Sequence, residues 1–250
     1  MSRRAVAFLV FALVVSAACV RLGFWQLSRL AERRELNAML AARLGGPPTP
    51  AREVARDTAT AAFRRVTATG TYDFANEFAL ASRTRQGSPG VNIITPLRLA
   101  GTDTAVLVNR GWVYAPDAMT ADLAKWREAD AATVVGYVTA IDRTGSNNAS
   151  APNNPRVVRH LYIDSLTSRV PYPLLPFLVV ATDSTRTTAG DSVPARLFAP
   201  FMDDGPHLGY AIQWFAFALI GVIGAAVGMR ADRRGFWLRR PRTIEARVRQ

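Results

Sequence analysis

The sequence predicts a membrane protein in which two transmembrane helices, one near each end, flank an antiparallel β-rich α+β domain outside the cytoplasm. Three observations predict this class. Two apolar runs without a charged residue, Ala5 to Val20 and Leu208 to Met229, lie near the ends of the 250-residue chain. Arginines cluster beside both runs. The chain between the runs contains short segments rich in Val, Thr, Ile, Tyr and Phe, the residues that strands favour.

Both apolar runs are predicted to cross a bilayer. Leu208 to Met229 extends about 33 Å as a helix, against a hydrocarbon core of about 30 Å. Ala5 to Val20 is shorter, but Leu22 to Phe24 extend it if Arg21 snorkels to the interface, where Trp25 then lies in the aromatic belt. A cleaved signal peptide is the alternative for the first run, since the residues before Cys19 resemble a weak lipoprotein box. Against it, the apolar sequence continues past that cysteine.

The formal net charge of +12 is concentrated beside the apolar runs. Arg3 and Arg4 precede the first run, and eight arginines against Asp232 and Glu245 follow the second, so these flanks carry +2 and +6 of the total. The positive-inside rule gives this pattern to a multi-pass protein with both termini in the cytoplasm. The lipid bilayer is therefore an expected partner and nucleic acid is not.

The predicted organisation has five parts. They are a transmembrane helix with an interfacial extension (5–27), a helical stalk and linker (28–62), a β-rich periplasmic domain (63–200), a second transmembrane helix (207–229) and a basic cytoplasmic tail (230–250).

Small residues recur on one face of each predicted membrane helix. The second helix carries His207, Ala211, Trp214, Ala218, Gly221, Ala225 and Gly228 at alternating spacings of four and three, and the first carries Ala5, Ala12, Ser16, Cys19 and Gly23. Because small side chains let helix backbones approach closely, this pattern predicts a hairpin that packs against itself or against a larger membrane partner.

The central segment is predicted to form strands, with few helices. A helical continuation over Leu27 to Leu44 ends at the Gly- and Pro-rich residues 45–50, and Gly101-Thr102-Asp103 suits a hairpin turn. A helix is expected from Asp117 to Glu128, capped by Asp117 or Thr120. The expected strands are 63–72, 77–83, 91–99, 105–113, 133–141, 156–163 and a buried one at 174–180, and the polar stretches 143–155 and 182–194 are expected loops.

The residue inventory argues against most enzyme classes. One cysteine excludes an internal disulfide and a zinc or iron–sulfur ligand set, and the sequence has no phosphate loop, dinucleotide fingerprint, nucleophile elbow, HExxH or CxxC. We therefore expect a protein that is not an enzyme. A hydrolase built around His160 and Asp164 is an alternative without an identified nucleophile, and the other interpretation of His160 is a half-buried strand residue.

His207 is a candidate ligand because it begins the second membrane helix, where an ionisable or ligating group is a functional candidate. Tyr210 and Trp214 follow it on the same face. Haem iron accepts a single histidine, and flat aromatic side chains suit a porphyrin. The other interpretation is that these residues are interfacial anchors, which are common at this depth.

Three segments together resemble the Surfeit locus protein 1 family. They are Leu22-Gly23-Phe24-Trp25-Gln26-Leu27-Ser28-Arg29, Val108-Asn109-Arg110-Gly111-Trp112-Val113 and His207-Leu208-Gly209-Tyr210-Ala211-Ile212-Gln213-Trp214-Phe215. Gly70-Thr71-Tyr72 and Thr95-Pro96-Leu97 also fit the family pattern, and the resemblance covers roughly residues 10–230.

The resemblance implies a non-enzymatic assembly factor for cytochrome c oxidase in respiratory chain biogenesis, acting when haem a enters the catalytic subunit. It implies the bacterial cytoplasmic (inner) membrane or the mitochondrial inner membrane, and the short N-terminus favours a bacterium with the domain in the periplasm. The expected partners are the oxidase catalytic subunit and, as a further candidate, the enzyme that makes haem a.

The implied haem a site contains His207 on the iron, Tyr210 and Trp214 along the ring, and Arg110 pairing a propionate. Another interpretation of Arg110 is that it satisfies a buried carboxylate while Trp112 packs in the core. The alternative function is a membrane-anchored scaffold that binds oxidase subunits or other assembly factors without haem. In that case the small-residue seam is the binding surface.

Overall fold

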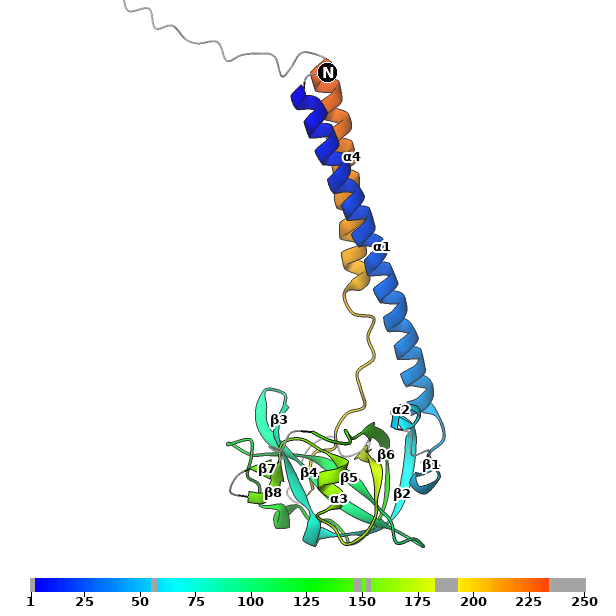
Figure 1. The fold of residues 1–250 in the computed structure, drawn as a ribbon, viewed down its shortest axis with the longest axis vertical. Helices are drawn as coiled ribbons and strands as arrows, with labels where there is room; N and C mark the ends of the chain where they lie inside the picture. The colour runs from blue at the N-terminus through cyan, green and yellow to red at the C-terminus, as the bar shows by residue number, and fades with distance from the viewer. Residues whose placement is uncertain (1–2, 55–57, 146–149, 152–153, 183–192, 234–250) are drawn as a thin grey trace, which may run out of the picture. The chain divides into compact units, whose positions relative to one another are not determined.

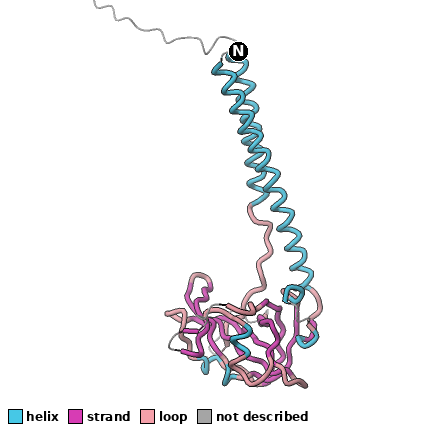
Figure 2. Tube along the Cα trace, in the orientation of Figure 1, coloured by secondary structure: helices cyan, strands magenta, loops and turns pink. Residues whose placement is uncertain are grey.

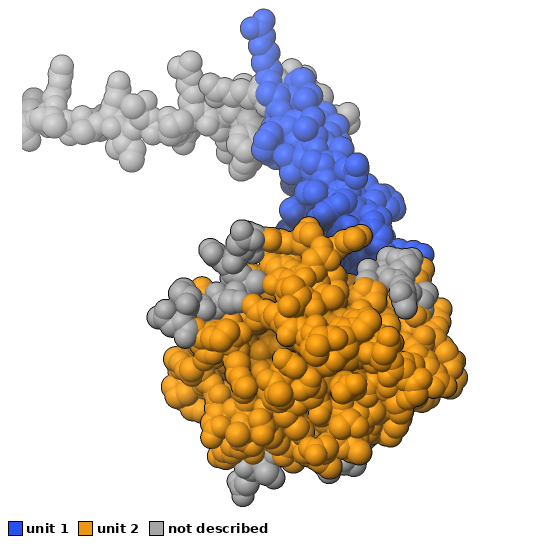
Figure 3. All heavy atoms as spheres, turned by 60° about the horizontal axis from the view of Figure 1, so that its bottom comes forward, with its two compact units in different colours: residues 1–38, 203–250 blue, residues 39–202 orange. Residues whose placement is uncertain are grey.

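The computed structural model describes residues 3–54, 58–145, 150–151, 154–182 and 193–233. The chain forms two compact units, residues 1–38 with 203–250, and residues 39–202 (Figure 3). The predicted cytoplasmic tail lies outside the described residues from position 234 onward, and so do parts of the two predicted polar loops.

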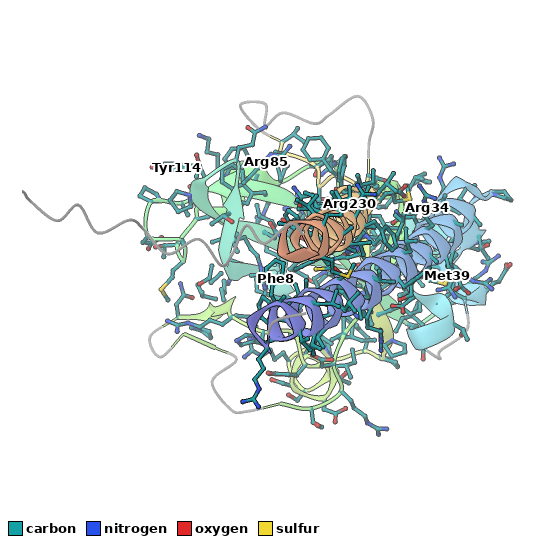
Figure 4. The ribbon with its side chains drawn as sticks, turned by 90° about the horizontal axis from the view of Figure 1, so that it is seen from above. Phe8, Arg34, Met39, Arg85, Tyr114 and Arg230 are labelled. Atoms are coloured by element: carbon teal, nitrogen blue, oxygen red, sulfur yellow. The ribbon has the colours of Figure 1, made fainter. Side chains whose placement is uncertain are left out.

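Two long helices form the first unit. α1 (Arg3–Gly45) runs beside α4 (His207–Arg233), as Figure 1 shows from the side and Figure 4 along the helices. Among the described residues these two helices are long and apolar enough to span a membrane, over Ala5–Gly45 and His207–Ala231. Together with the family assignment given below, this confirms the predicted membrane protein. The predicted helical continuation is also confirmed, because α1 runs without a break to Gly45.

Among the described residues of the second unit, nine strands form one sheet. Figure 2 shows the strands in magenta. The strands are β1 (Thr49–Pro50), β2 (Arg65–Tyr72), β3 (Phe78–Arg85), β4 (Ser88–Leu99), β5 (Ala105–Tyr114), β6 (Ala131–Ala140), β7 (Ser150–Ala151), β8 (Asn154–Val158) and β9 (Leu174–Ala181). The short helices are α2 (Thr58–Ala61), α3 (Ile163–Thr167) and the 3-10 turns η1 (Ala51–Glu53), η2 (Phe74–Asn76) and η3 (Leu123–Trp126).

Five of these strands close into a barrel. The sheet order runs β2, β6, β9, β5, β4, and an additional antiparallel pairing of β2 with β4 completes the ring. Gly70 lies at this closure opposite Leu99, and a Cβ at Gly70 would overlap the Arg98 carbonyl oxygen. Glycine is therefore required where the two backbones meet. The predicted β-rich domain is confirmed. Most of its strand pairings are antiparallel, as expected, but β1–β2, β3–β8 and β5–β9 are parallel.

β9 confirms the predicted buried strand, although it contains Pro176 and lies between two other strands of the barrel. A proline cannot donate to a strand ladder. The register with β5 shifts between the pairs Ala105–Leu174 and Leu107–Leu178, and the ladder with β6 begins at Phe177. Pro176 therefore lies in an irregular stretch that needs no backbone N–H from it.

The barrel core is made of the alternate inward-facing residues of these strands. Val66, Leu97, Val108, Val138 and Phe177 belong to one cluster and are essentially inaccessible to solvent. The β4–β5 connection is a hairpin through Gly101, whose φ of 76° is in the left-handed region that glycine adopts freely. This confirms the predicted turn.

The predicted helix from Asp117 to Glu128 is wrong. Asp117 accepts hydrogen bonds from the backbone of Met119 and Thr120, and Ala118 has a φ of 54°. These local bonds form a turn instead of starting a helix. Within the range predicted as a helix, the structure has one short 3-10 turn, η3, which Asp122 caps.

The prediction at residues 156–163 is also only partly right. β8 ends at Val158, and the chain then turns into α3. His160 is consequently an exposed residue beyond the strand, and its ring stacks on Tyr162 at 6.1 Å. The half-buried strand position expected for His160 is therefore wrong. Asp164 forms a long exposed ion pair with Arg143, at 3.8 Å.

Candidate functional site

The seam between α1 and α4 is built from small residues, as the sequence predicts. Ala211, Ala218 and Ala225 of α4 are buried, and so are Ala12, Ser16 and Cys19 of α1. A Cβ at Gly221 would overlap the Ser16 Oγ, and a Cβ at Gly23 would lie 2.6 Å from the Phe215 ring. The helices therefore pack more closely than larger residues would permit. The small-residue seam therefore packs the two helices of the hairpin against each other.

His207 begins α4 and forms a hydrogen bond across the hairpin. Its Nδ1 lies 2.8 Å from the Oε1 of Gln26 on α1. The ring is half-buried, and its Nε2 faces the turn before the helix, where a Cβ at Gly205 would lie 3.5 Å away. Gly205 has a φ of 65°, so a glycine suits that turn for its conformation as well. One ring nitrogen is thus bonded within the protein, and the other faces a residue without a side chain.

Aromatic residues line the hairpin next to His207. Trp214 is half-buried and packs edge to face with Phe217, with ring centroids 6.0 Å apart. Phe24 of α1 meets Phe215 of α4 in the same manner at 5.4 Å. Tyr210 is 48% exposed, one turn along from His207. The three α4 residues that the sequence singled out therefore lie on one side of one helix, with the tyrosine ring the most accessible of them.

Polar contacts tie the segment before α4 to α1. Arg34 pairs with Asp204 at 2.8 Å, and Arg33 pairs with Asp203 at 3.4 Å. The Asn37 side chain also donates to the Asp203 carbonyl at 2.7 Å. Because these groups are exposed, each ion pair contributes only about 0–1 kcal/mol. Their main effect is to fix the position at which the chain enters α4. The sequence did not indicate these contacts, because the partners lie about 170 residues apart.

Arg110 lies in the other unit, wholly buried on β5. Its Nη2 pairs with Glu77 at 3.1 Å and its Nη1 with Glu128 at 3.3 Å. Its Nε donates to the Thr95 hydroxyl at 2.8 Å, and Nη1 donates to the Trp126 carbonyl at 2.6 Å. All three guanidinium nitrogens are thus bonded within the domain. The structure shows Arg110 pairing with the buried Glu77 and the part-buried Glu128, which agrees with the other interpretation of this residue.

The cluster around Arg110 includes two further arginines. Arg196 holds Glu128 in a bidentate pair at 3.0 and 2.5 Å, and Arg127 reaches Glu77 at 3.3 Å. Arg110 also lies 5.6 Å from the centroid of the Tyr72 ring. Burial, followed by the charge of Glu128, raises the pKa of Tyr72 to about 12, so the phenol stays neutral beside these ions. The cluster joins Arg110 on β5 to Glu77, between η2 and β3, and to Arg127 and Glu128 in the segment that precedes β6.

The donor set of the hairpin suits one class of metal centre. Within the described part of the chain, no group of three or more His, Cys, Asp or Glu residues is placed to hold a metal ion. Structural and catalytic zinc sites require three or four such ligands, whereas haem iron is held by as few as one. A single half-buried histidine with flanking aromatic rings therefore fits haem better than a bare ion.

Comparison with known proteins decides the family. The model of the SURF1 family matches residues 13–219. The chain belongs to the SURF1 family. The matched range covers α1 from residue 13 onward, the barrel and α4 up to residue 219, and with them Gln26, Arg110, His207, Tyr210 and Trp214.

Relatives confirm the SURF1 assignment over most of the chain. A SURF1-like protein of Monosiga brevicollis is 32% identical over 213 residues, which cover 80% of this chain and 78% of the relative. Surfeit locus protein 1 of Takifugu rubripes is 23% identical, covering 82% and 90%. A SURF1-like protein of Drosophila melanogaster is 25% identical, covering 82% and 72%. Membership of the SURF1 family supports a general role in the assembly of cytochrome oxidase.

Proposed function

We propose that this protein assists the assembly of cytochrome c oxidase by holding haem a transiently at the His207 end of the helix hairpin and presenting it to the catalytic subunit. The observation that carries the proposal is the environment of His207. Its Nδ1 is bonded to Gln26, its Nε2 faces Gly205, and aromatic residues follow it on α4. A neutral imidazole nitrogen that is not bonded within the protein is the ligand that haem iron accepts.

Each residue of the hairpin site has a defined task in this proposal. His207 would hold the iron through Nε2, and Tyr210 and Trp214 would provide flat apolar surface beside it. When bound, haem a would supply a Lewis-acidic iron. A carrier must release its cargo, so one protein ligand would suit it better than two. The position of the site at the start of α4 leaves it open to a partner in the same membrane.

Arg110 has a structural task in this proposal. Recruiting Arg110 to a propionate would require it to leave Glu77, which is completely buried, and a buried carboxylate without its partner is strongly unfavourable. Arg110 therefore stabilises the barrel, and the proposed haem site consists of the hairpin residues His207, Tyr210 and Trp214.

The proposed location is the bacterial cytoplasmic membrane, with both termini in the cytoplasm and the β-rich domain in the periplasm. The arginines that flank the two spans support this orientation through the positive-inside rule. The proposed partners are the oxidase catalytic subunit and the enzyme that makes haem a, both of which lie in the same membrane in this scheme.

The scaffold alternative has less support from the hairpin. It used the small-residue seam as the partner surface, but that seam is buried between α1 and α4. A scaffold would therefore bind through the outer faces of the helices. A variant that loses co-purification of oxidase subunits while its haem content is unchanged would favour this alternative.

Restoration of oxidase assembly tests the proposed function. In a bacterial strain that lacks its own family member, wild-type protein should restore haem a in the oxidase catalytic subunit. His207→Ala should give oxidase activity no higher than the empty vector, at an equal level of membrane-inserted protein. His160→Ala is the matched control, because it removes the other of the two histidines from an exposed turn, and it should restore activity fully. Full restoration by His207→Ala would contradict the proposal.

A further inference from the structure

We propose that Gln26 is a positioning residue that fixes the tautomer of His207, so that the ring carries its proton on Nδ1 and presents a bare Nε2 to a metal. This inference rests on the proposed haem function, which it deepens by assigning the ligating atom and the residue that selects it. The geometry that points to it is the 2.8 Å contact between His207 Nδ1 and Gln26 Oε1.

The chemistry of the contact determines where the proton lies. An amide oxygen accepts hydrogen bonds and donates none, so the Nδ1 facing it carries a proton, and in the neutral ring this is the Nδ1–H tautomer. The remaining nitrogen, Nε2, then carries the lone pair. Histidines that bind metals commonly donate their other N–H to an oxygen of the protein, which fixes the ring orientation and raises the basicity of the ligating nitrogen. Gln26 stands in that relation to His207.

The surroundings of Nε2 fit this assignment. A Cβ at Gly205 would lie 3.5 Å from Nε2 and 3.4 Å from Cδ2. A side chain at position 205 would therefore cover the ligating edge. Its φ of 65° also disfavours any residue with a Cβ. Glycine at this position places no side chain over that edge of the ring.

The two residues occupy matched places in the hairpin. Along α1 as far as Leu30, the buried positions are Ala12, Ser16, Cys19, Gly23 and Leu30, and Gln26 fits their alternating spacing of four and three. His207 is likewise the first position of the α4 seam. Gln26 is thus a polar residue on a face otherwise made of small and apolar side chains, and His207 is the polar group that it meets. The hydrogen bond between them is part-buried, so water competes with it less than at an exposed site.

The contacts at the membrane-helix ends keep this pair in register. The pairs Arg33–Asp203 and Arg34–Asp204 hold the segment that enters α4, and the Gly23–Phe215 contact holds the helices together one turn from Gln26. The hydrogen bond therefore lies between two fixed points of the hairpin. This arrangement lets a single residue on α1 control the state of a ring on α4.

Nitrogen NMR of the histidine rings tests the inference directly. The protein is labelled with ¹⁵N-histidine in detergent micelles in the His160→Ala background, which leaves His207 as the sole histidine. At alkaline pH, where imidazole is neutral, wild type should show a protonated Nδ1 and a bare Nε2. Gln26→Leu should lose this preference, and Gln26→Glu should retain it because a carboxylate also accepts from Nδ1–H.

Haem titration of the same variants supplies the second readout. Gln26→Leu should bind haem a about 10- to 100-fold more weakly than wild type, the usual cost of removing the partner of a ligating histidine. Gln26→Glu should restore most of the affinity. A role of Gln26 in helix packing alone would instead leave the His207 tautomer unchanged in Gln26→Leu.

The outcomes separate this inference from the function on which it rests. A wild-type ring protonated on Nε2, or a Gln26→Leu variant with the wild-type tautomer and affinity, would overturn the role of Gln26 while haem binding through His207 still stood. A protein with the Nδ1–H tautomer that takes up no haem would refute the proposed function and leave the hydrogen bond supported.

Discussion

Arg110→Met is expected to destabilise the barrel by about 3–5 kcal/mol, a large share of the roughly 5–15 kcal/mol that stabilises a typical domain. The substitution keeps the length of the side chain and removes its charge. Glu77 then loses its buried partner and retains only Arg127, which is 44% exposed. Glu128 keeps its bidentate pair with Arg196. The effect therefore comes mainly from Glu77.

Chemical denaturation of the full chain in micelles measures this effect, followed by circular dichroism of the β-rich domain. Arg65→Met is the matched control, because Arg65 is an exposed residue at the start of β2, and it should change the free energy of unfolding by no more than about 0.5 kcal/mol. Arg110→Met together with Glu77→Leu should recover part of the loss, since an apolar pair needs no counter-charge. If Arg110→Met and Arg65→Met had the same free energy of unfolding, the structural role assigned to Arg110 would be contradicted.

Gly221→Leu is expected to force the two membrane helices apart. A Cβ at this position would already overlap the Ser16 Oγ, and leucine adds three further carbons. Overpacking of this kind costs about 1–3 kcal/mol. The separation should also weaken the hydrogen bond between Gln26 and His207, because that bond spans the same two helices.

Spin-label distance measurements test the helix separation. Labels are placed at Val14 and Leu219, which are 62% and 60% exposed, in a Cys19→Ala background. Gly221→Leu should lengthen and broaden the distance distribution. Gly224→Leu is the matched control, because no atom lies within 4 Å of a Cβ built there, and it should leave the wild-type distribution unchanged. Identical distributions for Gly221→Leu and wild type would show that the seam does not determine the packing.

The sequence predicted the elements whose signals are periodic and local. Both membrane helices follow from uninterrupted apolar runs, and the small-residue seam follows from spacings of four and three. The barrel strands follow from their β-branched and aromatic composition. The helix expected from Asp117 to Glu128 failed for an equally local reason. The Asp117 carboxylate, interpreted as a cap, bonds the next backbone amides in a turn that the residue pattern does not distinguish from a helix start.

The features that the sequence did not predict depend on contacts distant along the chain. Closure of the barrel requires β2 to pair with β4, and the residues of either strand do not indicate which strand it pairs with. Gln26 belonged to a quoted motif, but its contact with His207 joins positions 181 residues apart. Its spacing of three from Gly23, along the α1 seam, is a signal that could have identified it. The burial of Arg110 likewise appears only when Glu77 and Glu128 are placed in space.

The central claim is that His207 binds haem through one axial bond. The most direct measurement is the absorption spectrum of protein purified in detergent from cells that make haem a, for wild type and His207→Ala side by side. Wild type should show the Soret and α bands of haem a. His207→Ala should lose them and regain them in part when imidazole is added, since free imidazole replaces the missing ligand. A colourless wild type that stays colourless after haem is added, or a His207→Ala protein with the wild-type spectrum, would contradict the claim.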